Sequence, residues 1–301
     1  PFSQPNGWWS NYFGGSGNYL SVSSNSAFNL GSNNFTFECW AYTSSFSASY
    51  NVLVSQWNSS SNAWIFRITS GLIGLYANIG GTQDYNVSVT NTLNTWDHYA
   101  VARSGSSLYF FKNGSLVGTV SISGSISTSS SNVTLAVLSD LNSTTVHNGY
   151  ISNMRIVNGS AVYTSSFTPS TLPLTTTSQG VTAANVSLLT CQSNYFKDNS
   201  TNAFAITPSG SPSVQNFYPF FPPLDYSTAA IGGSGYFDGS GDYLSLANNA
   251  AFNLSSGSFT IEAWVYPFSN GATYRTIASA YTATWEMGLS GSTLYWWVGG
   301  T

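Results

Sequence analysis

Charged residues are scarce in this sequence, and their scarcity excludes several classes of protein. Lys, Arg, Asp and Glu together make up 5% of the 301 residues. Exposed helices are usually rich in Lys, Glu, Gln and Arg, and no long stretch keeps apolar residues at helical spacing, so a helical protein is excluded. The six basic residues are scattered singly along the chain, so we expect no nucleic-acid partner.

Long apolar runs and cysteines are scarce as well. No run approaches the roughly 18 apolar residues that are needed to cross a bilayer, so we expect no membrane insertion. The two cysteines, Cys39 and Cys191, are too few for a disulfide scaffold, and we do not expect them to pair. The chain starts with Pro1 rather than Met, which indicates a processed protein or a fragment.

Aromatic residues are abundant, at 16%, and they are accompanied by many Ser, Thr, Asn and Gly residues. These are the residues of strands and tight turns. Short runs of β-forming residues recur about every 10 residues, which is typical of an antiparallel β-sandwich. Residues 35–42 alternate clearly, and this predicts a strand with two unlike faces. One face carries Phe35, Phe37 and Cys39, and the other carries Thr36, Glu38, Trp40 and Tyr42.

The chain contains an internal repeat. Residues 11–42 match residues 235–266 at a constant offset of 224, and 19 of the 32 positions are identical. A period this long exceeds that of a solenoid, so each copy is expected to be a whole domain. We therefore predict tandem modules, the first spanning residues 1–178 and the second spanning residues 179–301.

The predicted boundary lies in residues 168–185, where Pro, Thr and Ser accumulate. Residues 186–220 precede the second copy and are expected to form its opening strand pair, which the first module would then lack. Thr301 aligns with Thr82, so the second module is expected to be incomplete at its C-terminus.

Two pairs of segments carry a family resemblance. W-D-H-Y-A-V-A-R at residues 96–103 is followed by S-L-Y-F-F-K-N-G-S-L-V at residues 107–117, whose Asn113 and Gly114 predict a type I′ hairpin turn. This pair resembles the core hairpins of laminin-G-like, or concanavalin-A-like, jelly rolls. Residues 149–174 followed by residues 188–206 are similar to the version found in tandem in large structural proteins of tailed phages, especially marine ones. The resemblance implies an all-β jelly-roll sandwich on a virion surface or outside a cell.

No catalytic constellation is present in the sequence, so we expect a protein that is not an enzyme. A retaining glycosidase on this fold would need two carboxylates about 5 Å apart, usually supplied by an E-x-D-x-x-E strand, and no such string occurs. Glu38 and Glu262 stand alone among aromatic residues and are expected to pair with cross-strand neighbours. A serine nucleophile would need His98 or His147 as its base, and no G-x-S-x-G elbow accompanies them.

Calcium is the one cofactor that the sequence leaves open. Loop carboxylates and carbonyls bind it in related folds, and the candidates here are Asp84, Asp97, Asp140 and Asn142. The related pattern often has acidic residues before the R-I strand, but this chain has Ser152 and Asn153 there. This loss of negative charge favours a module without a metal.

Sugar binding needs exposed aromatic faces with polar side chains beside them. The candidates lie in or beside the expected loops, and they are Trp57, Trp64, Tyr76, Tyr85 and, as the polar neighbour, Asp84. Trp8 and Trp9 also fit this description. The alternative for each of these aromatic residues is packing in the core or between modules. Trp40 and Trp96, on long predicted strands, are assigned to packing.

Together these features favour a non-catalytic structural or adhesion module of a surface assembly. The resemblance points to a phage virion protein, such as a tail fibre, a tail-associated protein or a capsid decoration. Its expected partners are other virion or surface proteins, a second copy of itself, or a host glycan. The alternatives are a carbohydrate-binding adhesin of a cell surface and a glucanase, which the missing carboxylate pair disfavours.

Overall fold

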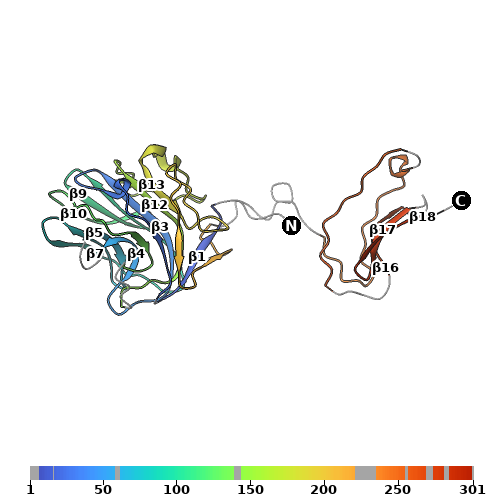
Figure 1. Cartoon of the computed structure of the whole chain (residues 1–301), viewed down its shortest axis with the longest axis horizontal. Coiled ribbons are helices and arrows are strands. Elements are labelled where there is room, and N and C mark those ends of the chain that lie inside the picture. The colour runs from blue at the N-terminus through green and yellow to red at the C-terminus, as the bar shows by residue number, and fades with distance from the viewer. Residues whose placement is uncertain are drawn as a thin grey trace. The chain divides into compact units, whose positions relative to one another are not determined.

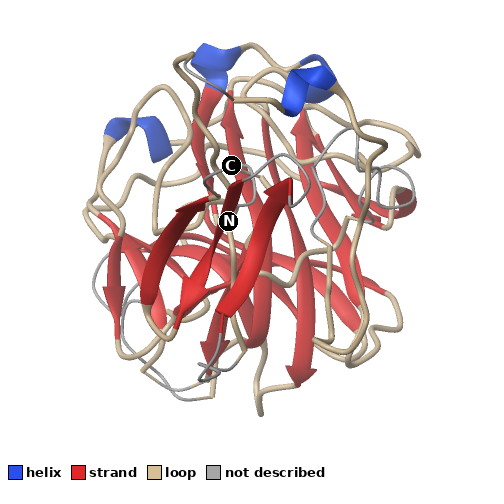
Figure 2. Cartoon of the chain, turned by 90° about the vertical axis from the view of Figure 1, so that its right-hand side faces the viewer, coloured by secondary structure: helices blue, strands red, loops and turns tan. Residues whose placement is uncertain are grey.

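The computed structural model describes residues 7–15, 17–57, 62–138, 144–220, 235–254, 257–268, 274–280 and 285–299. The chain divides into two units (Figure 1). The first unit comprises Phe2–Tyr226 and the second comprises Ser227–Thr301. Strands and loops make up nearly all of the residues that the structure describes, and the helices among them are short 3-10 turns (Figure 2). Among the described residues, no helix is long and apolar enough to span a membrane.

The first unit is a sandwich of two antiparallel sheets. Sheet A has the order β10 (Ser115–Ser121), β9 (Ser107–Lys112), β8 (Trp96–Ser104), β3 (Phe35–Ser45), β12 (Asn148–Asn158), β1 (Ser10–Gly14) and β15 (Ser213–Gln215), and β13 (Val186–Thr190) also pairs with β12. Sheet B has the order β14 (Thr207–Ser209), β2 (Tyr19–Val22), β11 (Val133–Leu135), β4 (Asn51–Trp57), β5 (Asn62–Ile68), β6 (Leu72–Asn78) and β7 (Thr82–Ser88). The predicted all-β sandwich is therefore confirmed. Short 3-10 turns in this unit are η1 (Ser26–Phe28), η2 (Ser178–Gly180) and η3 (Ala183–Asn185).

The alternation of residues along β3 places the core between the two sheets. Phe35, Phe37 and Cys39 are fully buried in one hydrophobic cluster with side chains of sheet B, such as Phe66. Both cysteines of the chain are free and buried in this core. The predicted turn between β9 and β10 also has the expected backbone, because Asn113 and Gly114 both have positive φ angles, of 49° and 77°.

The outer face of sheet A is partly covered as well, so Thr36 and Glu38 of β3 are also buried. Tyr163 and Phe167, which follow β12, pack on Phe111 of β9. Trp40 of β3 contacts Phe220, and Trp96 of β8 contacts Phe217. Trp40 and Trp96 have the packing role predicted from the sequence, but they pack on this outer face rather than between the sheets.

The boundary between the units differs from the predicted one between residues 178 and 179. Strand β13 pairs with β12, β14 pairs with β2, and β15 pairs with β1, so residues 186–220 complete the first unit. The reason is burial, because all five residues of β13 are buried and they need the edge of β12 to satisfy their backbone. The segment that was expected to be a linker packs on the same region, with Leu174 and Val181 buried against Val157.

The second unit contains a three-stranded antiparallel sheet of β16 (Tyr274–Ala280), β17 (Trp285–Ser290) and β18 (Thr293–Val298), and the turn η4 (Ala250–Phe252). The indole nitrogen of Trp285 donates a hydrogen bond to the carbonyl of Phe252. Several of its large apolar side chains are exposed, and these include Tyr266, Trp296 and Trp297.

Candidate functional site

A group of aromatic and charged side chains lies on the outer face of sheet B, turned away from the core. Along β5, Trp64, Phe66 and Ile68 belong to the core, so the alternating Ile65 and Arg67 point to the outer face. Tyr76 of β6 lies on the same face. Three aromatic side chains, of Tyr50, Trp57 and Tyr76, pack on a small apolar cluster of Val52, Ile65 and Leu138 and keep part of their surface exposed. We call this surface the tyrosine face.

Arg67 lies at the centre of the tyrosine face. Its guanidinium carbon is 4.8 Å from the ring centre of Tyr50 and 4.1 Å from that of Tyr76, which are cation-π distances. Gly74 is the register partner of Arg67 on β6, and a Cβ there would lie 3.3 Å from the guanidinium. The glycine therefore leaves room for the arginine to lie across β6 between the two rings.

The charge of Arg67 is balanced within the tyrosine face. Its Nη2 donates to Oδ1 of Asp84 on β7 over 2.7 Å. The arginine side chain is 4% exposed, whereas the aspartate side chain is 39% exposed. The face therefore offers solvent a carboxylate acceptor beside aromatic rings, while the positive charge stays below the surface.

The structure brings together three of the five residues predicted to bind sugar. Trp57, Tyr76 and Asp84 share the tyrosine face, but Trp64 and Tyr85 lie on the other side of sheet B. Trp64 is fully buried, with its ring centre 4.7 Å from that of Phe37, and Tyr85 packs against the same core. This corrects the prediction, and the reason is the period of two in a strand, which places neighbours such as Asp84 and Tyr85 on opposite faces.

The sequence analysis missed Tyr50 and Arg67 as members of this face. A signal for Arg67 was available, because it alternates with three apolar core residues in A-W-I-F-R-I at residues 63–68. The other aromatic candidates lie elsewhere. Trp8 packs edge-on against Tyr218 and Phe220, and the carbonyl of Trp9 accepts a hydrogen bond from Ser152.

The predicted calcium ligands are not gathered at one place. Asp84 is on sheet B and Asp97 is on sheet A, and each faces a cation, since Oδ2 of Asp97 is 3.1 Å from Nζ of Lys112. Asp140 and Asn142 lie outside the described residues. Within the described ranges, no three His, Cys, Asp or Glu side chains form a cluster that could hold a metal ion. The expectation of a module without a bound metal stays a prediction.

Glu38 is the centre of a buried polar network on the outer face of sheet A. Arg155, its cross-strand neighbour on β12, donates to Oε1 from Nε and Nη2 over 2.8 and 2.6 Å. Tyr163 donates to Oε2 over 2.9 Å, and Nε2 of His98 is 3.3 Å from the same oxygen. Nη1 of Arg155 also donates to the carbonyl of Ser178. The network thus ties the segment after β12 to the sheet, and it confirms the expectation that Glu38 pairs with a cross-strand neighbour.

The protonation of this network follows from its geometry. Burial alone would raise the pKa of Glu38, but the charge of Arg155 and the hydrogen bonds from His98 and Arg155 outweigh it and lower this pKa to about 2. Glu38, His98 and Arg155 have almost no exposed surface. A carboxylate that stays ionised and is out of reach of a substrate cannot act as a general acid.

Comparisons with known proteins agree with this architecture. Residues 13–162 match the Laminin_G_3 family, described as the concanavalin A-like lectin/glucanases superfamily. A search of curated protein sequences finds no match.

Similar solved structures include a carbohydrate-binding candidate from Bacteroides ovatus, with 15% identity and a TM-score of 0.44 over 68% of this chain and 61% of that one. This chain therefore spans about three fifths of the length of that protein. A pentraxin from Limulus polyphemus has 14% identity and a TM-score of 0.44 over 67% of this chain and 94% of that one. Domains LG4-5 of the mouse laminin alpha1 chain have 14% identity and a TM-score of 0.40 over 54% of this chain and 47% of that one.

The family match and the antiparallel two-sheet topology together make residues 13–162 a laminin-G-type, concanavalin A-like jelly-roll domain.

Proposed function

We propose that this chain is a non-catalytic adhesion module that binds neutral glycans through the tyrosine face. The observation that carries the proposal is the combination of part-exposed aromatic side chains at Tyr50, Trp57 and Tyr76 with the exposed carboxylate of Asp84. Aromatic rings stack on the C–H faces of sugars, and a carboxylate oxygen accepts hydrogen bonds from their hydroxyl groups. Because Arg67 is neutralised by Asp84 and covered, nothing at this face selects for an anionic sugar.

A binding role is favoured over catalysis by the positions of the carboxylates. Glu38 is buried on the outer side of sheet A, and Asp84 is exposed on the outer side of sheet B with Arg67 as its partner. Hydrolysis of a glycoside needs two carboxylates that flank one bond, about 5 Å to about 9.5 Å apart. These two residues lie on opposite sides of the sandwich, so they do not form such a pair.

For the setting of this module, we propose a surface assembly, either a phage virion or a cell surface. Support comes from the repeated sequence and the low charge, which suit an extracellular array of modules. Immunogold electron microscopy with an antibody against the first unit would separate the two settings. Label on phage particles supports the virion, and label on intact cells supports an adhesin.

The glycan proposal is tested by screening the labelled 301-residue chain on a glycan array. We expect binding to neutral glycans, and we expect Trp57→Ala and Tyr76→Ala each to weaken it at least about 10-fold, which is about 1.4 kcal/mol. Tyr195→Ala is the matched control, because this tyrosine is 55% exposed and lies outside the tyrosine face. No binding in the array, or equal binding by all four proteins, would overturn the proposal. Hydrolysis of any polysaccharide would instead support an enzyme.

A further inference from the structure

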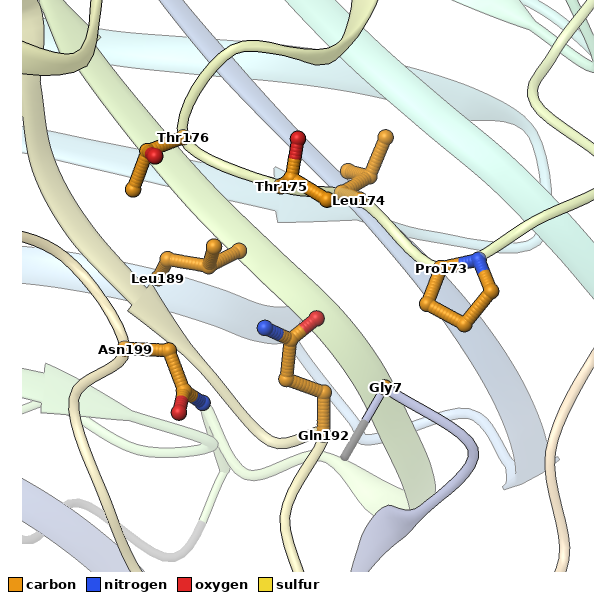
Figure 3. Close-up of a pocket in the computed structure, with 8 residues that line it drawn as sticks. All are labelled: Gly7, Pro173, Leu174, Thr175, Thr176, Leu189, Gln192 and Asn199. Carbon is orange, nitrogen blue, oxygen red and sulfur yellow. The ribbon is translucent and has the colours of Figure 1, made fainter. Parts of the chain in front are cut away.

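A pocket lies on the opposite side of the first unit from the tyrosine face, beside β13. It has a volume of about 240 Å³. Its lining residues, shown in Figure 3, are Gly7, Pro173, Leu174, Thr175, Thr176, Leu189, Gln192 and Asn199. None of them is charged. The walls come from three distant parts of the sequence, so the pocket exists only in the folded unit.

Asn153 holds two of these walls in place. Its Nδ2 donates to the carbonyl of Gly7 over 3.0 Å, and its Oδ1 accepts from the backbone nitrogen of Leu174 over 2.9 Å. The backbone nitrogen of Asn153 also donates a hydrogen bond to the carbonyl of Cys191, the residue before Gln192. Asn153 is fully buried and has a φ of 52°, a conformation that asparagine tolerates better than most residues. Asn153, which stands where the related pattern has an acidic residue, therefore positions the walls of the pocket.

Gln192 contributes the polar group inside the pocket. Its backbone is fixed, because its carbonyl accepts a hydrogen bond from the nitrogen of Gly7. Its side chain is 4% exposed and points into the space between Leu189, Asn199 and the 173–176 segment (Figure 3). No described residue donates a hydrogen bond to its Oε1 atom, which is buried. A buried acceptor without a donor costs about 1–3 kcal/mol, so this position favours a molecule that brings an O–H or N–H group.

The other lining residues indicate which further chemical groups such a molecule would have. Pro173, Leu174 and Leu189 supply apolar surface, while Asn199 and Thr176 supply polar groups at the edge. The amide of Asn199 is itself oriented by a hydrogen bond of its Nδ2 to Oγ of Ser193 over 2.9 Å. A volume of 240 Å³ is below the 300–1,000 Å³ or so of sites for drug-sized ligands, and it suits a single sugar ring.

We propose that this pocket is a second ligand site, which binds one neutral pyranose residue. A hydroxyl or N-acyl N–H of the sugar donates to Oε1 of Gln192, and the C–H face of the ring lies against Pro173, Leu174 and Leu189. The site is separate from the tyrosine face, because the pocket is beside sheet A and the face is on sheet B. A glycan could therefore engage the unit at two places.

The test uses the full chain and four neutral probes, the methyl glycosides of glucose, galactose, mannose and N-acetylglucosamine. Binding is followed by saturation-transfer difference NMR and calorimetry in a Tyr76→Ala background, which weakens binding at the tyrosine face. We expect at least one probe to bind with a dissociation constant in the millimolar range. We expect Gln192→Leu, which keeps the size of the side chain, to weaken that binding at least about 10-fold without lowering the melting temperature.

A second variant guards against a folding defect. Thr176→Trp fills the mouth of the pocket from a half-buried position and should also abolish the binding. Three outcomes would overturn the proposal: no binding of any probe up to about 50 mM, where a contact of even about 2 kcal/mol would be detected; unchanged affinity in Gln192→Leu; or unchanged affinity in Thr176→Trp. Loss of array binding in Tyr76→Ala alone bears on the tyrosine face and leaves this pocket untouched.

Discussion

The two copies of the repeated sequence share a capped 3-10 turn, but they bury their side chains differently. In each copy an asparagine caps a 3-10 turn, with Asn25 accepting from the nitrogen of Ala27 and Asn249 from that of Ala251, both over 2.9 Å. Yet Leu20 is fully buried in the first unit, whereas its counterpart Leu244 is 86% exposed. Local hydrogen bonds need only nearby residues, while burial needs strands from far along the chain.

The tyrosine face also has a counterpart in the second unit, with a different charge. Tyr274 and Tyr295 meet edge to face with ring centres 5.0 Å apart, as Tyr50 and Tyr76 do at 5.7 Å. At the aligned position of Arg67 the second copy has Gly288. The charged residue beside this second pair of rings is Glu286, which accepts hydrogen bonds from Tyr295 and from Thr276. These two bonds lower the pKa of the Glu286 carboxyl. The aromatic pair is thus common to both units, and the charge beside it is not.

The largest expected difference between the units is in independent folding. Residues 1–226 should give a monomer with a cooperative melt, because both sheets of the sandwich are complete. Residues 227–301 should aggregate or stay partly unfolded, since Tyr266, Trp296 and Trp297 are exposed. The same failure is expected of residues 186–301, whose first strands belong to the other unit. Circular dichroism melts and amide NMR dispersion measure this, and a sharp two-state melt of residues 227–301 would contradict it.

A pair of equivalent glutamates sharpens the comparison. Glu38→Ala leaves the buried Arg155 without its carboxylate and should destabilise the first unit by about 3–5 kcal/mol. Glu262→Ala, at the matching exposed position, should change stability by no more than about 0.5 kcal/mol. Chemical denaturation of residues 1–226 measures the first effect, and thermal melting of the full chain compares the two variants. Equal effects would mean that the Glu38 network contributes nothing to stability.

Acid should destabilise the first unit in two steps. Burial lowers the pKa of His147 to about 4, from 6.5 in the unfolded chain, so between these values the unfolded state binds more protons. Stability should therefore fall by up to about 3 kcal/mol as the pH drops from 6.5 to 4. The lowered pKa of Glu38, about 2, adds a further loss as the pH drops below 4.5. Urea melts at several pH values test this, with His147→Asn as the control that should flatten the first step.

The smallest expected effect is that of metal removal. Ser152 and Asn153, in the positions that are acidic in the related pattern, make neutral hydrogen bonds to the carbonyls of Trp9 and Gly7. EDTA should therefore shift the melting temperature of the first unit by less than about 5 °C, which corresponds to about 1–2.5 kcal/mol for a domain of this size. A larger drop would reveal a structural ion, and adding back calcium would identify it.

The sequence by itself determined the features that depend on near neighbours. The alternation in residues 35–42 predicted the two faces of β3, because side chains in a strand alternate with a period of two. Asn113-Gly114 predicted the hairpin turn after β9, because these two residue types readily adopt the positive φ angles of a type I′ turn. The capped 3-10 turn likewise forms in both copies of the repeat, because its hydrogen bond joins residues only two apart.

Only the tertiary structure decided which of these faces are covered. Trp57 and Trp64 look alike in the sequence, but one lies on the tyrosine face and the other is in the core. Glu38 became a buried ion-pair partner because the segment after β12 folds over it, and Gln192 faces a pocket because Gly7 and Leu174 meet beside it. Periodicity shows which residues share a face, but the free energy of burying that face comes from segments far away along the chain.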